Sequence, residues 1–362
     1  MTEHQKILVA MSGGVDSSVS ACLLQEAGYD CEGVTMRLYR NEDIGLSRFH
    51  TCCSQADIDD AADVAFSLDI PFHVADFTAE FRMDVIEPFI CTYESGGTPN
   101  PCIECNRHMK FHHLLDFATK HGCDAIATGH YARIDYDPKQ NRWLLKKAVD
   151  KSKDQSYVLY MLTQLQLARI RLPLGGLQKI RVRELAEARG LTNARKHDSQ
   201  DICFVPDGDY VHFMEQYTGR THPAGDFLDL KGMVVGRHQG AVRYTLGQRK
   251  GLGLAMNEPV YVCDKCMANN TVTVGPEQNL YRQSLLAGEV NWIPFDAPAG
   301  PLRVTACIRY HQKEQPATVS MTQNGKLRVV FDAPQRAVTP GQAVVLYQGD
   351  LVLGGGTIEK TF

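Results

Sequence analysis

The sequence predicts an α/β protein with a parallel-sheet domain, a small central domain and a C-terminal β-barrel. Three observations support this prediction. Strand-like and helix-like segments alternate up to about Phe204, Pro and Gly then interrupt the pattern, and short alternating segments follow from Thr271 onward. A chain of 362 residues also exceeds what one hydrophobic core usually supports. We therefore expect domains at residues 1–205, 206–280 and 281–362.

The first domain has the pattern of a parallel sheet. A β-branched, apolar run at 6–11 enters a Gly-rich turn, and the helical pattern that follows at 17–27 ends at Gly28. Because parallel strands need crossover connections, the alternation implies helices packed on the sheet. Further strands are predicted at 31–39, 72–77 and 125–128, and further helices at 57–68 and 114–120.

The remaining chain has a different texture. Pro206, Gly208 and Gly219 lie in a stretch without strand–helix alternation, which predicts a domain boundary. Asn324-Gly325 is typical of a hairpin turn between two strands. Short alternating strands that indicate a small barrel are predicted at 303–310, 317–321, 327–331 and 343–347.

The composition is that of a globular protein without a membrane segment. Apolar residues make up 44% and charged residues 22% of the chain, and no run approaches the ~20 apolar residues of a membrane helix. The amino terminus shows no leader pattern, so we expect a cytoplasmic location and no membrane partner. In that reducing compartment the twelve cysteines are interpreted as thiols, ligands or redox groups.

Two clusters of basic residues indicate RNA despite the net charge of −4. Between 231 and 257 five basic residues stand among six glycines without an acid, which favours contacts with RNA phosphates. Between 169 and 196 eight basic residues accompany two acids, and there a solvated helix face explains the pattern equally well.

The Gly-rich turn Ser12-Gly13-Gly14-Val15-Asp16-Ser17 lies between a predicted strand and a predicted helix. Backbone N–H groups and the helix dipole favour an anion there, so the turn is a candidate phosphate site. It lacks the lysine and spacing of a Walker loop and fits the pyrophosphate loop of enzymes that split ATP into AMP and pyrophosphate. The Asp16 carboxylate is a candidate Mg²⁺ ligand. A simple Gly-rich turn is the alternative.

Further motifs follow in order along nearly the whole chain. They are Met36, Thr98-Pro99-Asn100-Pro101 leading to Cys105-Asn106, Thr128-Gly129-His130-Tyr131-Ala132, Lys153-Asp154-Gln155-Ser156-Tyr157, Ser199-Gln200-Asp201-Ile202-Cys203-Phe204, Tyr244-Thr245-Leu246-Gly247-Gln248-Arg249, Arg309-Tyr310 and Pro340-Gly341-Gln342. In this order they resemble the bacterial tRNA-specific 2-thiouridylases, a family of pyrophosphate-loop ATPases.

The resemblance implies an enzyme that adenylates the wobble uridine of lysine, glutamate and glutamine tRNAs and replaces its 2-carbonyl oxygen by sulfur. Cys203 would carry a persulfide, supplied by a donor or relay protein, and Cys105 would be the attacking thiol, leaving a mixed disulfide. ATP would be bound by Ala10, Met11, Ser12, Gly13, Gly14, Val15, Asp16, Ser17, Met36 and Gly129. The tRNA would be contacted by Asn100, Pro101, Cys102, His130, Lys153, Asp154, Gln155, Arg309, Tyr310 and Gln342.

Cys102 departs from the commoner family pattern, which has Asp at this position of the Pro-Asn-Pro-X-X-X-Cys run. The proposed acid–base carboxylate is therefore missing, and Cys102, Cys105 and Cys203 become three thiols at one expected site. Three thiolates could hold an iron–sulfur cluster with one open iron. A two-cysteine persulfide route with a spare thiol is the simpler interpretation.

The other cysteines admit weaker alternatives. Cys263 and Cys266, together with Cys102 and Cys105, would make a four-cysteine zinc set, although the pairs belong to different predicted domains. Cys52 and Cys53 could be redox-active or incidental.

Two other functions stay open at this point. An amidating synthetase would share the loop and need no cysteine pair. A noncatalytic RNA-binding or sulfur-carrier protein would need only the barrel and the basic clusters.

Overall fold

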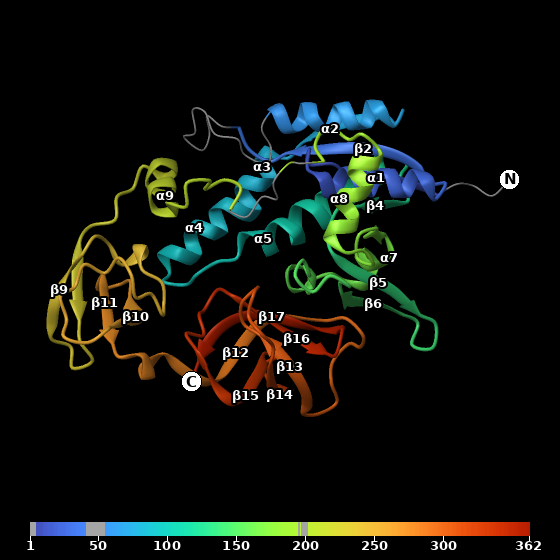
Figure 1. Cartoon of the computed structure of the whole chain (residues 1–362). Helices are drawn as coiled ribbons and strands as arrows, with labels where there is room; N and C mark the ends of the chain where they lie inside the picture. Colours follow the sequence, from blue (N-terminus) through green and yellow to red (C-terminus); the bar gives the residue numbers. More distant parts are fainter. Residues whose placement is uncertain (1–4, 41–54, 195, 197–201) are drawn as a thin grey trace.

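The computed structural model describes residues 5–40, 55–194, 196 and 202–362. Figure 1 shows an α/β part, a small sheet to one side and a barrel below. The α/β part contains a five-stranded sheet in the order β3-β2-β1-β4-β7, and each neighbouring pair is parallel. The four predicted strands are confirmed, and the two-residue strand β7 is additional. The strands are β1 (Lys6–Ala10), β2 (Asp30–Arg37), β3 (Phe72–Asp76), β4 (Ala125–Ala127) and β7 (Ile170–Arg171).

Apolar side chains cover both faces of this sheet. Along β1, Ile7 and Val9 enter one cluster and Leu8 enters another, as the alternation of a strand requires. Both faces are therefore buried, which suits a parallel sheet. The first cluster includes α1 (Val15–Glu26), α2 (Gln55–Ser67) and α8 (Lys179–Ala188), and the second includes η3 (Cys105–His113) and α6 (Leu114–Lys120).

Two longer helical runs flank the sheet, and each contains a π-helical stretch. The predicted helix at 114–120 is confirmed as α6, but no sequence pattern indicated the nine π-helical residues before it. Such stretches are frequent at functional sites. The first run is α3 (Thr78–Phe81), η2 (Arg82–Ile86) and α4 (Glu87–Glu94), and the second is α5 (Pro101–Glu104), η3 and α6.

The central region consists of one helix and a four-stranded sheet in the order β10-β11-β8-β9. The helix α9 (Tyr210–Thr218) packs on α4, where the Tyr93 and Tyr210 rings stack with centroids 4.2 Å apart. The strands are β8 (Gly225–Leu228), β9 (Val234–His238), β10 (Tyr261–Cys266) and β11 (Thr271–Gly275). Shorter helices elsewhere are η4 (Ser156–Leu159), α7 (Gln164–Ala168), η5 (Ala241–Arg243) and η6 (Glu277–Leu280).

The C-terminal region is a closed barrel, as predicted. Its strand order is β12-β15-β14-β13-β16-β17, and β17 pairs back onto β12. The four predicted strands are present, and the Asn324-Gly325 turn joins two of them. The two strands that close the barrel escaped prediction. The strands are β12 (Tyr281–Trp292), β13 (Leu302–Cys307), β14 (Gln315–Met321), β15 (Leu327–Arg336), β16 (Ala343–Gln348) and β17 (Leu351–Thr361).

A hairpin of the α/β part extends the barrel. Strands β5 (Ala132–Asp137) and β6 (Arg142–Lys147) are antiparallel, and β6 pairs with β17 at Lys146 and Leu351. The apolar cluster on this side contains Leu8 of the parallel sheet and also Val345 and Val352 of the barrel. The α/β part and the barrel therefore share one core. No helix in the described part of the chain is long and apolar enough to cross a membrane.

Candidate active site

The Gly-rich turn lies between β1 and α1, at the carboxyl edge of the sheet. Gly13 has φ +67°, and a Cβ there would lie 2.5 Å from the Asp57 carbonyl oxygen, so the position requires glycine. Ser17 Oγ donates to the Gly14 carbonyl (2.9 Å) and accepts from the Ser12 N–H (3.2 Å). These bonds fix the turn at the N-terminus of a 12-residue helix, where an anion is favoured.

The Asp16 carboxylate is held by two side chains from other elements. Tyr131 Oη donates to Asp16 Oδ1 (2.7 Å), and Lys179 Nζ lies 2.8 and 2.7 Å from the two carboxylate oxygens. Only 10% of the Lys179 side chain is exposed. In the described structure the cation beside Asp16 is therefore the Lys179 ammonium group, and the Mg²⁺ ligand role of Asp16 stays a prediction.

The turn after β4 packs directly on the Gly-rich turn. A Cβ on Gly129 would lie 2.9 Å from both the Asp16 carbonyl carbon and the Ser17 nitrogen, so this contact also requires glycine. The His130 ring is buried and its Nδ1 lies 2.7 Å from Thr128 Oγ1. Burial lowers the pKa of His130 well below its ordinary value, so the ring is neutral. Its contact with Thr128 stabilises the turn.

Residues 153–155 are tied to the same turn. The Gln155 N–H donates to the Tyr131 carbonyl (2.8 Å), and Gln155 Oε1 accepts from the Tyr131 N–H (2.9 Å). Asp154 accepts from the Ala148 N–H and from Ser156 Oγ, each at 2.8 Å, and burial raises its pKa. Lys153, which is half-buried, directly precedes these two hydrogen-bonded residues.

Two of the three candidate thiols share one apolar cluster. Cys105 starts the π-helical η3, and Cys203 is fixed through its carbonyl, which accepts from Tyr39 Oη (2.7 Å). Both half-buried side chains pack on the cluster that contains Phe81 and Phe204. Two cysteines 98 positions apart therefore pack against the same apolar cluster.

The third thiol, Cys102, is exposed on α5 and lies near the barrel. Burial, followed by the nearby Asp154 and Cys102, raises the pKa of Tyr310 to about 12. Asn100 caps α5, since its side chain accepts from the Ile103 N–H (3.4 Å), and buried Pro101 is the first residue of the helix.

The barrel holds the segment that leads into α5. Gln342 Nε2 donates to the carbonyls of Thr98 (2.9 Å) and Pro99 (3.1 Å). The Thr98 N–H donates to the Pro340 carbonyl (2.9 Å), and Gly341, with φ +89°, allows the close approach. We call these contacts between 340–342 and 98–99 the barrel clamp. Arg309 lies nearby on the barrel, where its Nη2 donates to the Ala337 carbonyl (2.6 Å).

Met36 and Ala10 complete the carboxyl edge of the sheet. Ala10 pairs with Val34, and Met36 lies two residues further along β2, half-buried between two apolar clusters. The predicted nucleotide residues therefore surround one edge, as is usual in open parallel sheets.

Family models match three consecutive parts of the chain. A tRNA methyl transferase HUP domain matches residues 5–207, a tRNA methyl transferase PRC-barrel domain matches 211–276, and an aminomethyltransferase β-barrel domain matches 282–358. Proteins named tRNA-specific 2-thiouridylase match over the full length. The protein from Clostridioides difficile is 46% identical over 100% of both chains, and that from Acetivibrio thermocellus is 49% identical over 98% of this chain and 99% of its own.

The chain belongs to the tRNA-specific 2-thiouridylase family. Among solved structures, a 4-thiouridine synthetase–RNA complex with bound ATP has a TM-score of 0.36 and 18% identity, covering 59% of this chain and 50% of that one. That likeness is too slight to bear on function.

The first basic stretch of this thiouridylase-family chain turns mostly inward. Arg169 donates to the Asp124 carbonyl (2.9 Å), and Arg189 pairs with Glu26. Lys179 lies against Asp16, as described above. Acids and carbonyls distant in the sequence hold these three side chains, whereas Arg181 and Arg183 are exposed on α8, so RNA contact by 169–196 stays a prediction.

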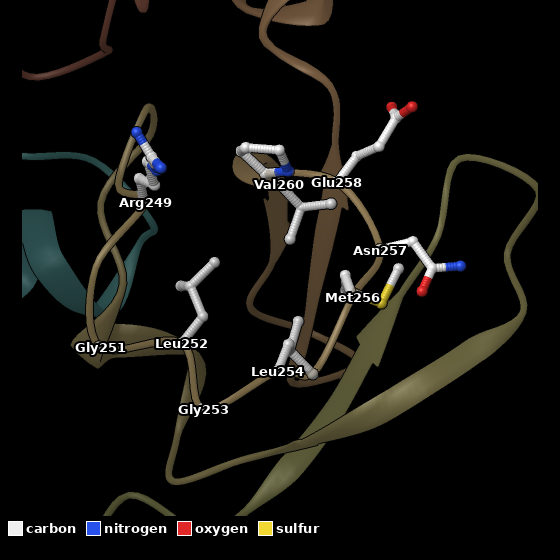
Figure 2. A pocket seen from close by; sticks show the side chains of 10 residues that line it. Arg249, Gly251, Leu252, Gly253, Leu254, Met256, Asn257, Glu258 and Val260 are labelled. Carbon is white, nitrogen blue, oxygen red and sulfur yellow. The ribbon is translucent and has the colours of Figure 1, made fainter.

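The second basic stretch is divided. Arg243 lies 3.3 Å from Glu215, an acid of α9 that lies outside the stretch. Arg249 and Lys250 are exposed. Arg249 also borders an open cavity of about 480 Å³, which Leu252, Leu254 and other residues of the 249–260 loop line (Figure 2).

The cysteine sets proposed for metals are not assembled. Among the described residues no group of three or more His, Cys, Asp or Glu side chains is arranged to hold a metal ion. An iron–sulfur cluster on Cys102, Cys105 and Cys203 therefore does not fit this arrangement. Cys263 and Cys266 lie on the same strand, β10, in the central sheet, and Cys266 is exposed.

Some predicted features lie outside the described residues, namely Cys52, Cys53, Arg195 and 199–201 of the motif before Cys203.

Sequence reasoning missed three side chains that contact the Gly-rich turn or its Asp16, namely Tyr131, Lys179 and Asn193. Asn193 Nδ2 donates to the Gly13 carbonyl (3.1 Å) and to Ser18 Oγ (2.8 Å). Tyr131 lay within a recognised motif, but nothing in the sequence linked Lys179 or Asn193 to a turn more than 160 residues earlier.

Proposed function

We propose that the protein is an ATP-dependent tRNA 2-thiouridylase. The observation that carries the proposal is the match, over essentially the full chain, to proteins named tRNA-specific 2-thiouridylase. The rigid Gly-rich turn at the N-terminus of α1 supports ATP as the activating substrate. The full-length match does not favour an amidating synthetase or a noncatalytic RNA-binding protein.

The first step is adenylation of the uridine. The 2-carbonyl oxygen attacks the α-phosphorus of ATP, a P–O bond forms, the α–β anhydride bond breaks, and pyrophosphate leaves. The carbonyl oxygen thereby becomes part of a phosphate ester and can depart as AMP. In this proposal the turn at 12–17 receives the pyrophosphate, and Met36 and Gly129 border the nucleotide.

The second step is sulfur transfer. A Cys203 persulfide, loaded by an external persulfide donor, attacks C2 with its terminal sulfur, and AMP leaves with the former carbonyl oxygen. The Cys105 thiolate then attacks the Cys203 sulfur, and the S–S electron pair stays on the transferred sulfur. Alternatively, Cys105 attacks first and releases hydrosulfide. Either route leaves a Cys105–Cys203 disulfide, which a thiol reductant must reduce by two electrons. The shared packing of both cysteines supports this pairing.

We assign the tRNA contacts to the faces around α5 and the barrel. Asn100, Pro101 and Cys102 meet the target base, while Lys153, Arg309 and Tyr310 contact the neighbouring RNA. In the described structure His130, Asp154, Gln155 and Gln342 hold backbone or neighbouring side chains, so we expect their effect on RNA to pass through the segments that they support.

The test combines two products. Purified protein is incubated with ATP, a low-molecular-weight persulfide and a tRNA with uridine at the wobble position; the same tRNA with cytidine there is the control. We expect pyrophosphate release that depends on the uridine, and 2-thiouridine in the nucleoside mass spectrum. An aminated nucleoside would indicate an amidating synthetase, and RNA binding without pyrophosphate release would indicate a noncatalytic protein.

A further inference from the structure

Residues 179–194 and Lys196 contain three side chains that contact the Gly-rich turn or residues beside it. Lys179 reaches Asp16 at the start of this segment, and Asn193 bonds the Gly13 carbonyl and Ser18 at its end. Lys196 Nζ then bonds Asp57 (2.6 Å), the residue whose carbonyl lies against Gly13. Both ends of this segment are therefore fitted to the turn that receives phosphate in the proposed function.

Lys179 is held in place from three directions. Its backbone N–H donates to Asp150 Oδ2 (2.9 Å), which fixes the start of α8. Its ammonium group bonds both oxygens of Asp16, and the Tyr131 ring, whose hydroxyl bonds the same carboxylate, lies 5.8 Å from Nζ. A long flexible side chain is thus immobilised next to the second residue of α1.

The charges at this turn need a cation. The ATP triphosphate is strongly negative, and an ionised Asp16 in the first turn of α1 would repel it in a half-buried site. Lys179 neutralises that carboxylate, and its ammonium group lies against Asp16 of the turn itself. Because this ammonium group is already held in place, it can stabilise the negative charge that develops on the leaving pyrophosphate without a rearrangement of the site.

We propose that Lys179 is an ATP-binding and catalytic residue whose ammonium group bonds the phosphates that leave as pyrophosphate. Asp16 and Tyr131 are positioning residues that orient it. The proposal rests on the proposed function for the identity of the reaction. It replaces the assignment of Asp16 to Mg²⁺ and that of Lys179 to RNA.

The decisive experiment measures nucleotide binding without tRNA. Isothermal titration with ATP and with adenosine compares the wild type with Lys179→Met and Lys179→Arg. Lys147→Met is the matched control, because the Lys147 side chain is 11% exposed, pairs with Glu314 and lies on the β5–β6 hairpin. We expect Lys179→Met to weaken ATP binding on the order of 10- to 100-fold, the worth of a charged hydrogen bond. Adenosine affinity should stay within about twofold, since only the phosphates lose a partner.

The controls separate the possible failures. Lys179→Arg should keep part of the ATP affinity, and Lys147→Met should keep all of it. Unchanged ATP affinity in folded Lys179→Met, or equal losses for ATP and adenosine, would overturn the proposal. A wild-type protein that binds no ATP would instead contradict the proposed function itself.

A double variant tests whether Lys179 only neutralises Asp16. If so, Asp16→Asn combined with Lys179→Met removes both charges and should restore ATP binding, which would overturn the phosphate contact. If Lys179 also bonds the phosphates, the double variant should recover only the loss that the unpaired Asp16 causes and should still bind ATP more weakly than Asp16→Asn alone.

Discussion

At the scale of single residues, the proposed route assigns sulfur chemistry to two cysteines and none to Cys102. Cys203→Ser should abolish thiolation because it removes the carrier, and Cys105→Ser should abolish it because no thiol remains to cleave the persulfide. Both variants should release pyrophosphate with tRNA at nearly the wild-type rate. Thiolation above about a tenth of the wild-type rate in either one, measured by nucleoside mass spectrometry, would remove that cysteine from the route.

Cys102 lies near Tyr310 and is exposed, whereas the other two thiols are half-buried against one apolar cluster. Cys102→Ser and Cys102→Asp should therefore keep appreciable thiolation, and the aspartate variant restores the commoner family residue. Iron and acid-labile sulfide assays on anaerobically purified protein accompany the activity measurement. An iron-containing wild type and an iron-free, inactive Cys102→Asp that still adenylates tRNA would favour the cluster over the persulfide.

The residue scale also shows where prediction from sequence ends. The Gly-rich turn was readable because Gly13 and its neighbours form a local pattern with one physical use. The Asp16–Lys179 pair was not readable, because its members lie 163 positions apart and Lys179 stands among arginines that suggest a solvated face. The pairing of Arg243 was unreadable for the same reason. Acids were counted only between 231 and 257, and its partner Glu215 lies outside that range.

At the scale of elements, the second basic stretch contains an exposed pair and an internally paired arginine. Arg249→Ala with Lys250→Ala should weaken tRNA binding and lower the slope of log affinity against log salt by roughly 1 to 2, because fewer counterions are released. Arg243→Ala is the control and should leave the slope unchanged, since Glu215 already holds that side chain. Equal slopes for all three proteins, measured by fluorescence anisotropy, would exclude this loop as an RNA contact.

The barrel clamp joins a barrel turn to the segment that leads into α5. Gln342→Met removes both amide hydrogen bonds at similar volume, so the 98–102 segment should lose its fixed position. We expect thiolation to fall about tenfold or more while tRNA affinity changes less than about twofold. Gln348→Met is the control, because that side chain is exposed on β16. A large loss of tRNA affinity with normal thiolation at saturating tRNA would mean that Gln342 contacts RNA directly.

At the scale of the whole molecule, the α/β part and the barrel share a core, and we expect them to unfold together. In a Trp143→Phe variant, the fluorescence of Trp292 on β12 follows unfolding of the barrel. Far-ultraviolet circular dichroism follows unfolding of the helices of the α/β part. Urea transitions from the two probes should coincide. Leu162→Ala, in the shared core, should shift both by the same amount, about 2–5 kcal/mol. Separate midpoints would show two independent units.

The order of the three regions along the chain was predictable from local patterns, whereas the pairing that closes the barrel was not. The alternation in the first 205 residues indicates a parallel sheet whatever follows it. The long strands β12 and β17 are closed by pairing with each other, across about 70 positions, and short windows of sequence contain no sign of such a partner. The hairpin at 132–147 was also missed, although it contributes Leu145 to the shared core.

The strand pairing between β6 and β17 limits how such a chain can be rearranged. A gene fragment that stops near residue 280 would leave Leu145 and Leu159 without the barrel side chains that cover them, and the truncated product should be prone to aggregate. A barrel grafted alone onto another enzyme would likewise lack the strand that flanks β17. Exchange between relatives would have to move the hairpin and the barrel as one inherited unit, even though more than 130 residues of chain separate them.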